Sequence, residues 1–107
     1  MNTHKITTPI GKAEVEIRDW ITGRQAEYID ELMYEAIAVK ADMAGKTDIG
    51  NIDLKKIISE TNHRKIEVFV VSVNGNSEDV LTDVVLNMHE EDYQFILDSI
   101  DEQRKKK

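Results

Sequence analysis

The sequence predicts a mainly α fold, in which three or four helices pack with a short N-terminal β-hairpin. One stretch near the start alternates apolar and charged residues, which is the period of a half-buried strand. Three later stretches place apolar residues three and four positions apart, which is the spacing of a helix face. The chain has 107 residues, of which 40% are hydrophobic and 33% are charged. We therefore expect one globular domain spanning residues 1–107.

The hairpin is expected within residues 1–20. Residues 13–18 read Ala-Glu-Val-Glu-Ile-Arg, so that apolar side chains fall on one face of a strand and charged ones on the other. Ile6 lies among threonines, which favours an earlier strand. Between them, Pro9 presets φ and Gly11 is free to adopt a positive φ, which is typical of a turn.

Two longer helices are expected next. The first is predicted over residues 22–44, because Thr22 is a good N-cap and Gln25 completes a capping box. The second is predicted over residues 52–73, with an uncertain end. Residues 66–73 are rich in β-branched and aromatic side chains, which favours a strand. No turn signal separates them from the preceding helix, so helix is the preferred interpretation and a strand is the alternative.

Asn74-Gly75 is the strongest turn signal in the chain. After it the apolar residues follow helical spacing, so residues 77–103 are predicted to form two short helices, the first of them capped by Ser77. Acids open the last helix and the basic tail 104–107 follows its end. Both placements suit the helix dipole.

The residue types exclude several kinds of chemistry. The chain has no cysteine, which removes disulfides and thiol catalysis. Its three histidines are scattered, and no phosphate-binding or nucleophile motif is present. We therefore expect no catalytic residue, no metal and no cofactor, and we interpret the protein as a non-enzyme.

The distribution of apolar residues indicates the compartment. No apolar run approaches the roughly 20 residues of a membrane-spanning helix. The N-terminus lacks the apolar stretch of a signal peptide. We expect a cytoplasmic protein that does not bind membranes.

The net charge is −7, and the acids are concentrated in one half of the chain. Residues 67–102 contain no lysine or arginine, and they carry ten acids. Such a surface repels phosphate backbones, so nucleic acid is not an expected partner. Two interpretations stay open: a solvated face that keeps the protein soluble, or a docking surface for a basic partner.

The expected partner-binding residues lie mainly in this acidic half. Tyr93, Phe95 and Ile96 are the expected apolar anchors, and Phe95 lies off the apolar stripe of its helix. Glu91 and Asp92 are expected to steer the partner. Trp20, just before the first helix, is either a hydrophobic plug between hairpin and helix or a further interface anchor.

Two segments resemble the tail assembly chaperones of long-tailed bacteriophages. Near the start, Ile6-Thr7-Thr8-Pro9-Ile10-Gly11-Lys12 and then Val15-Glu16-Ile17-Arg18 are similar to that family's opening, which runs into a Thr-capped helix. Near the end, Val71-Ser72-Val73-Asn74-Gly75 and then residues 91–100, Glu-Asp-Tyr-Gln-Phe-Ile-Leu-Asp-Ser-Ile, resemble its closing pattern. A similar opening occurs in phage baseplate-hub chaperones.

The resemblance implies a non-enzymatic role in virion assembly. Such chaperones bind the tape measure protein in the host cell cytoplasm, keep it soluble, and help to recruit tail tube protein. Alternatives are a helical adaptor or regulatory protein, and a baseplate or head–tail structural component. We also expect a homo-oligomer, because the predicted apolar faces exceed what a two-helix layer could hide.

Overall fold

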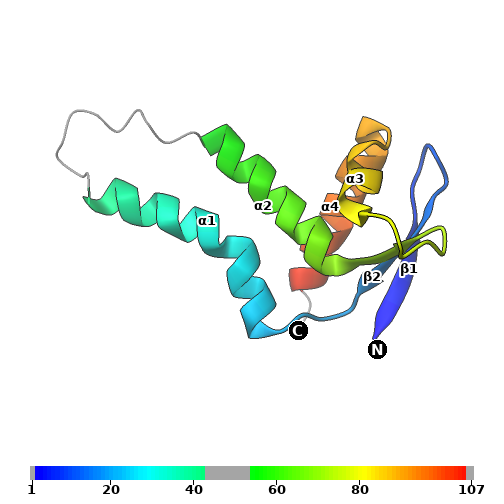
Figure 1. Ribbon diagram of the computed structural model, residues 1–107, viewed down its shortest axis with the longest axis horizontal. Helices are drawn as coiled ribbons and strands as arrows, with labels where there is room; N and C mark the ends of the chain where they lie inside the picture. The colour runs from blue at the N-terminus through cyan, green and yellow to red at the C-terminus, as the bar shows by residue number, and fades with distance from the viewer. Residues whose placement is uncertain (1, 43–53, 106–107) are drawn as a thin grey trace.

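The computed structural model describes residues 2–42 and 54–105, with the backbone alone over residues 37–42 (Figure 1). These residues form four helices and one small antiparallel sheet. The elements in chain order are β1 (Thr3–Thr7), β2 (Glu14–Arg18), α1 (Gly23–Asp42), α2 (Leu54–Phe69), β3 (Val70–Val73), α3 (Leu81–Leu86) and α4 (Glu90–Lys105). The predicted mainly α fold with an N-terminal hairpin is confirmed in outline, but the sheet has a third strand.

The preferred interpretation of residues 66–73 as helix is wrong in its second half. α2 ends at Phe69 and the chain passes directly into β3, which pairs antiparallel with β2. β2 is therefore the central strand, with an irregularity in register between Glu16 and Ile17. The valines of β3 have side chains that favour a strand. The edge of β2 that does not face β1 offers backbone hydrogen-bond partners to β3, and a longer α2 would leave those partners unpaired.

Asn74 and Gly75 form the tight turn after β3. Both adopt a positive φ, 52° and 81° respectively, as a type I′ turn requires. Val73 and Asn76 exchange two backbone hydrogen bonds across it, at 3.0 and 2.9 Å. The amide of Glu14 donates to the Asn74 side chain at 2.8 Å, which fastens the turn to β2.

The predicted cap of the next helix, Ser77, does not cap it. The side-chain oxygen of Asn76 accepts a hydrogen bond from the amide of Glu78 at 2.9 Å. α3 begins only after Val80, which makes no side-chain cap bond. Asparagine readily bonds the backbone two residues ahead of it, and this turn delays the start of the helix.

The start of α1 follows the sequence prediction. The Thr22 amide donates to Gln25 Oε1 at 2.9 Å, and the Gln25 amide donates to Thr22 Oγ1 at 3.1 Å, which is the expected capping box. The predicted end of this helix at 44, the predicted start of the second helix at 52, and tail residues 106–107 lie outside the described residues.

The hydrophobic core lies where the sheet meets the helices. All four helices and the strands β2 and β3 contribute buried side chains, and Ile6 of β1 packs against them. The buried members are Val15, Ile17, Ile29, Ile66, Phe69, Val70, Val73, Val85, Ile96, Leu97 and Ile100.

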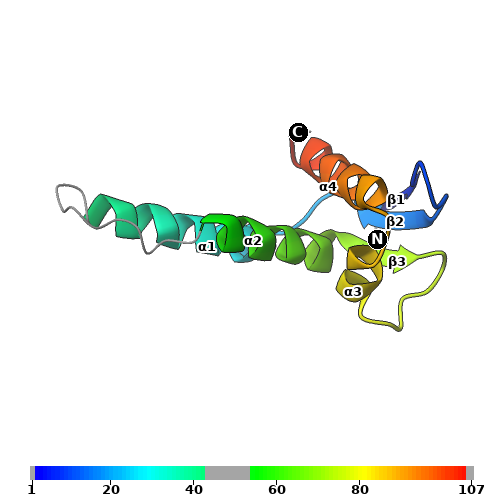
Figure 2. The ribbon, with the colours of Figure 1, turned by 90° about the horizontal axis from the view of Figure 1, so that it is seen from above.

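α1 and α2 pack along one another and project from the sheet as a two-helix arm (Figures 1 and 2). Arg64 of α2 holds this seam. It lies 4.4 Å from the centre of the Tyr28 ring, donates to the Tyr28 carbonyl at 2.7 Å, and pairs with Glu31 at 3.0 Å. The seam therefore joins the two helices through a cation–π contact and hydrogen bonds as well as apolar packing.

Asp92, in the first turn of α4, is the one buried ionisable side chain in residues 2–36 and 54–105. Its carboxylate accepts hydrogen bonds from the amides of Ile10 at 2.8 Å and Gly11 at 2.7 Å, and the Thr8 hydroxyl also donates to it. Burial raises the pKa of Asp92, but these donors and nearby His89 outweigh burial, so the pKa lies below its usual range. Asp92 thus ties the β1–β2 turn to α4.

We predict that Asp92→Asn lowers the melting temperature at pH 7, because an amide nitrogen would face backbone donors. A lowered folded-state pKa means that the carboxylate stabilises the fold above the unfolded pKa, about 4, and that this contribution is lost as the pH falls toward the folded pKa. Melting curves of the two proteins should therefore converge below about pH 4. Asp98→Asn, at an exposed position of the same helix, is the control. Equal melting temperatures at pH 7 would contradict the assignment.

Candidate protein-binding site

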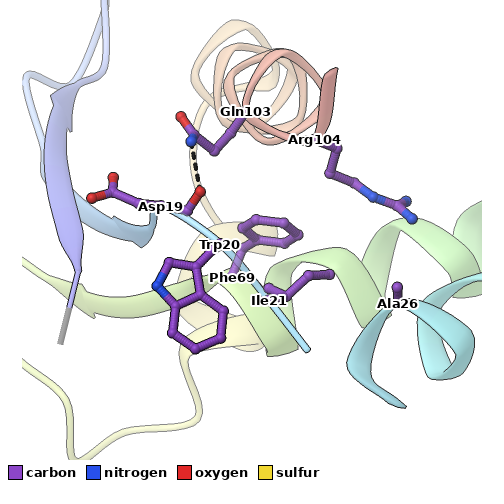
Figure 3. Close-up of a pocket in the computed structure, with 7 residues that line it drawn as sticks. All are labelled: Asp19, Trp20, Ile21, Ala26, Phe69, Gln103 and Arg104. Carbon is purple, nitrogen blue, oxygen red and sulfur yellow. Dashed lines mark hydrogen bonds between the residues drawn. The ribbon is translucent and has the colours of Figure 1, made fainter. Parts of the chain in front are cut away.

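The candidate site is a hollow of about 290 Å³ beside Trp20, which we call the Trp20 hollow (Figure 3). It lies where the link between β2 and α1 passes the end of α2 and the end of α4. Its lining residues are Asp19, Trp20, Ile21, Ala26, Phe69, Gln103 and Arg104.

The backbone next to Trp20 is held on two sides. The amide of Asp19 donates to the carbonyl of Asn2 at 2.9 Å, which continues the β1–β2 pairing. The carbonyl of Asp19 accepts from the Gln103 side chain at 2.7 Å, the bond drawn in Figure 3. The Trp20 side chain is nevertheless 61% exposed. The fold therefore fixes the position of this residue without covering its ring.

The hollow combines an apolar floor with a charged rim. Phe69, the last residue of α2, is buried beneath it. Figure 3 shows Asp19 at one end and Arg104 at the other, with the aromatic rings between them. Arg104 pairs with Asp30 of α1 at 2.8 Å, and this contact raises the pKa of the guanidinium further. Such a surface can accept an apolar side chain from another molecule and offers polar groups around it.

Two of the predicted partner-binding residues are unavailable to a partner. Ile96 is fully buried, because it shares with Leu97 and Ile100 the face of α4 that packs into the core. Asp92 is buried against the β1–β2 turn. Their assignment as partner contacts is therefore corrected to a role in the fold.

The remaining predicted residues do not form one site. Tyr93 is half-buried and packs against the core, whereas Phe95 is half-buried outside it. Glu91 is exposed. These residues lie at the start of α4, and Trp20 lies beside its end. Of the two interpretations of Trp20, a hydrophobic plug between hairpin and helix does not fit, since most of the residue is open to solvent.

Sequence reasoning missed the other walls of the Trp20 hollow. Phe69 is the one aromatic residue of the run 66–73, but nothing in the sequence places it beside Trp20. Arg104 reads as part of a basic tail, yet it pairs with Asp30, 74 positions away. No local signal could have found these contacts, because each joins segments that are distant in the sequence.

Glu16 of β2 is not poised to act as a general acid. The Thr3 hydroxyl, and then that of Ser72, donate to Glu16 and hold its pKa below the usual range. A general acid at neutral pH needs a raised pKa. Within the described residues, no cluster of three or more acidic or histidine side chains is arranged to hold a metal ion.

None of the helices described is both long and apolar enough to cross a membrane. Comparisons of the chain with protein-family models, with curated proteins and with solved structures find no match. The site is therefore interpreted from its own geometry.

The two aromatic residues of the hollow should differ in their effect on stability. We predict that Trp20→Ala changes the free energy of unfolding by less than about 0.5 kcal/mol, as exposed positions usually do. Phe69→Ala should cost about 3–5 kcal/mol, because it leaves a cavity in the core. Urea denaturation followed by circular dichroism measures both. A large loss of stability in Trp20→Ala would show that its ring supports the fold.

Proposed function

We propose that this protein works by binding another protein, and that the Trp20 hollow receives an apolar side chain of that partner. The carrying observation is a tryptophan that is 61% exposed on a backbone fixed by hydrogen bonds. Tryptophan is among the residues that contribute most to protein interfaces when they become buried. In a single copy of this chain, Trp20 stays exposed and does not contribute that burial.

The geometry around Trp20 supports binding over a structural role. The bonds from Asp19 to Asn2 and Gln103 position the residue before any partner arrives. A preformed anchor loses little backbone freedom on binding, which favours affinity. The ion pair between Arg104 and Asp30 offers a polar rim beside the apolar floor, as protein interfaces commonly do.

The more specific proposal is a non-enzymatic tail assembly chaperone of a long-tailed phage. It rests on the resemblance of the opening segment and of the closing segment to that family. The client would then be the tape measure protein, kept soluble in the host cytoplasm while tail tube protein is recruited. The net charge of −7 supports this role, because an acidic exterior helps to keep a complex with an apolar client in solution.

A helical adaptor or regulatory protein, or a baseplate or head–tail component, would use the same hollow for a different partner. The identity of the protein captured distinguishes these functions. The hollow itself only requires that the partner present an apolar side chain.

The test is binding of a phage tape measure protein to this chain, with and without Trp20. Trp20 is the only tryptophan, so its fluorescence reports the hollow directly, provided that a client fragment without tryptophan is used. Binding should shift the emission to shorter wavelength, and Trp20→Ala should weaken binding by about 1–3 kcal/mol.

Val80→Ala is the matched control, because Val80 is 66% exposed and lies at the start of α3, away from the hollow. It should bind like the natural chain. Full binding by Trp20→Ala would overturn the assignment of the site. Absence of binding by the natural chain would overturn the choice of client.

A further inference from the structure

We propose that a second copy of this chain docks on the arm, with the outer face of its α4 lying in a groove between α1 and α2. This groove, the arm groove, has a volume of about 220 Å³. Its walls come from both arm helices, and Arg104 of α4 closes its base. The inference does not depend on the client proposed above.

The arm groove is open and combines apolar with polar walls, the polar ones being Asp30, Thr61, Asn62, Lys65 and Arg104. Met33 of α1 and Ile58 of α2 line it, and Ile58 is 51% exposed. Leu54, one helical turn before Ile58, is 45% exposed, and Tyr34, next to Met33, is 62% exposed. A two-helix layer cannot cover both of its faces, so these side chains stay open to solvent in a single copy.

The charged side chains described around the arm groove differ between its two ends. At its base, Arg104 pairs with Asp30 and Lys65 pairs with Asp101, each at 2.8 Å, so the charges there are neutralised. Toward the other end, the first turn of α2 carries Lys55 and no acid. Lys55 is exposed and forms no ion pair within the described residues. The positive end of the helix dipole adds to its charge, so this end favours an acidic occupant.

The outer face of α4 has the complementary character. Glu91, Phe95, Asp98 and Glu102 follow one another at helical spacing and share one face. The three acids are exposed, and none forms an ion pair within the described part of the chain. Phe95 is half-buried but lies outside the core and outside the side chains packed against it. This face is that of an acidic helix with an aromatic anchor.

The occupant must be the α4 of another copy. Within one copy, the end of α4 already sits at the base of the arm groove, through Lys65 and Arg104. Its acidic first half therefore cannot also reach the groove. A second copy supplies an acidic amphipathic helix, and helices commonly dock in grooves of this kind. Because the contact joins two different surfaces, it can pair two copies reciprocally or add further copies in a row.

The experiment measures the mass of the full chain by sedimentation equilibrium at low salt. The natural chain should self-associate. Lys55→Glu and Asp98→Lys, both at exposed positions, should each weaken association about ten-fold or more, which equals about 1.4 kcal/mol. An equimolar mixture of the two variants should associate again, because each variant supplies the surface that the other lacks: the natural α4 of one meets the natural groove of the other, and the two reversed positions also attract. Glu78→Lys reverses an exposed acid outside both surfaces and is the control.

Several results would overturn the proposal. The proposal is excluded if the natural chain is folded, as circular dichroism would show, and stays monomeric at every concentration. Association that neither reversal weakens places the contact elsewhere, and a mixture that stays dissociated contradicts the pairing of the two surfaces. Trp20→Ala should associate normally, so that failure of client binding and failure of self-association are seen separately.

Discussion

The carboxylate of Asp92 joins the two halves of this fold. It lies in the first turn of α4, where the helix dipole already favours a negative charge, and it accepts two amides of the β1–β2 turn. Eleven residues later, Gln103 binds the other end of the same hairpin at Asp19. α4 therefore holds the hairpin at both ends. The Trp20 hollow depends on this arrangement, because its walls come from the hairpin's exit and from the end of α4.

The parts of the fold that sequence reasoning predicted are those held by neighbours in the chain. The Thr22–Gln25 box and the turn at Asn74-Gly75 each join residues only a few positions apart. Residues 70–73 were assigned wrongly, because their conformation is decided by β2, more than 50 positions earlier. β-branched side chains permitted either state, and only the presence of an open strand edge selects the strand.

The candidate site was harder to predict than the fold. Ile96 was expected to anchor a partner, but it lies on the face of the last helix that packs into the core. Asp92 looked like an ordinary acid at a helix start, since its partners Ile10 and Gly11 are about 80 positions away. Of the Trp20 hollow, the sequence pointed to Trp20 alone as a candidate interface anchor. That Phe69 and Gln103 lie beside it is seen only in the tertiary structure. The spacing of apolar residues in a sequence indicates which side chains face the core. It does not indicate which side chains surround an exposed residue.

The arm explains why exposed apolar residues persist in this chain. Its seam is satisfied within one copy, through Arg64, Tyr28 and Glu31. The arm helices therefore do not need Ile58 or Tyr34 to stay together, and exposing these side chains forgoes favourable burial. The same chain concentrates lysines at the start of α2 and acids along α4. Within the described residues of one molecule, Lys55 and the exposed acids of α4 form no ion pair. The proposed contact between molecules would bring Lys55 and these acids together and cover the apolar surface in the same step.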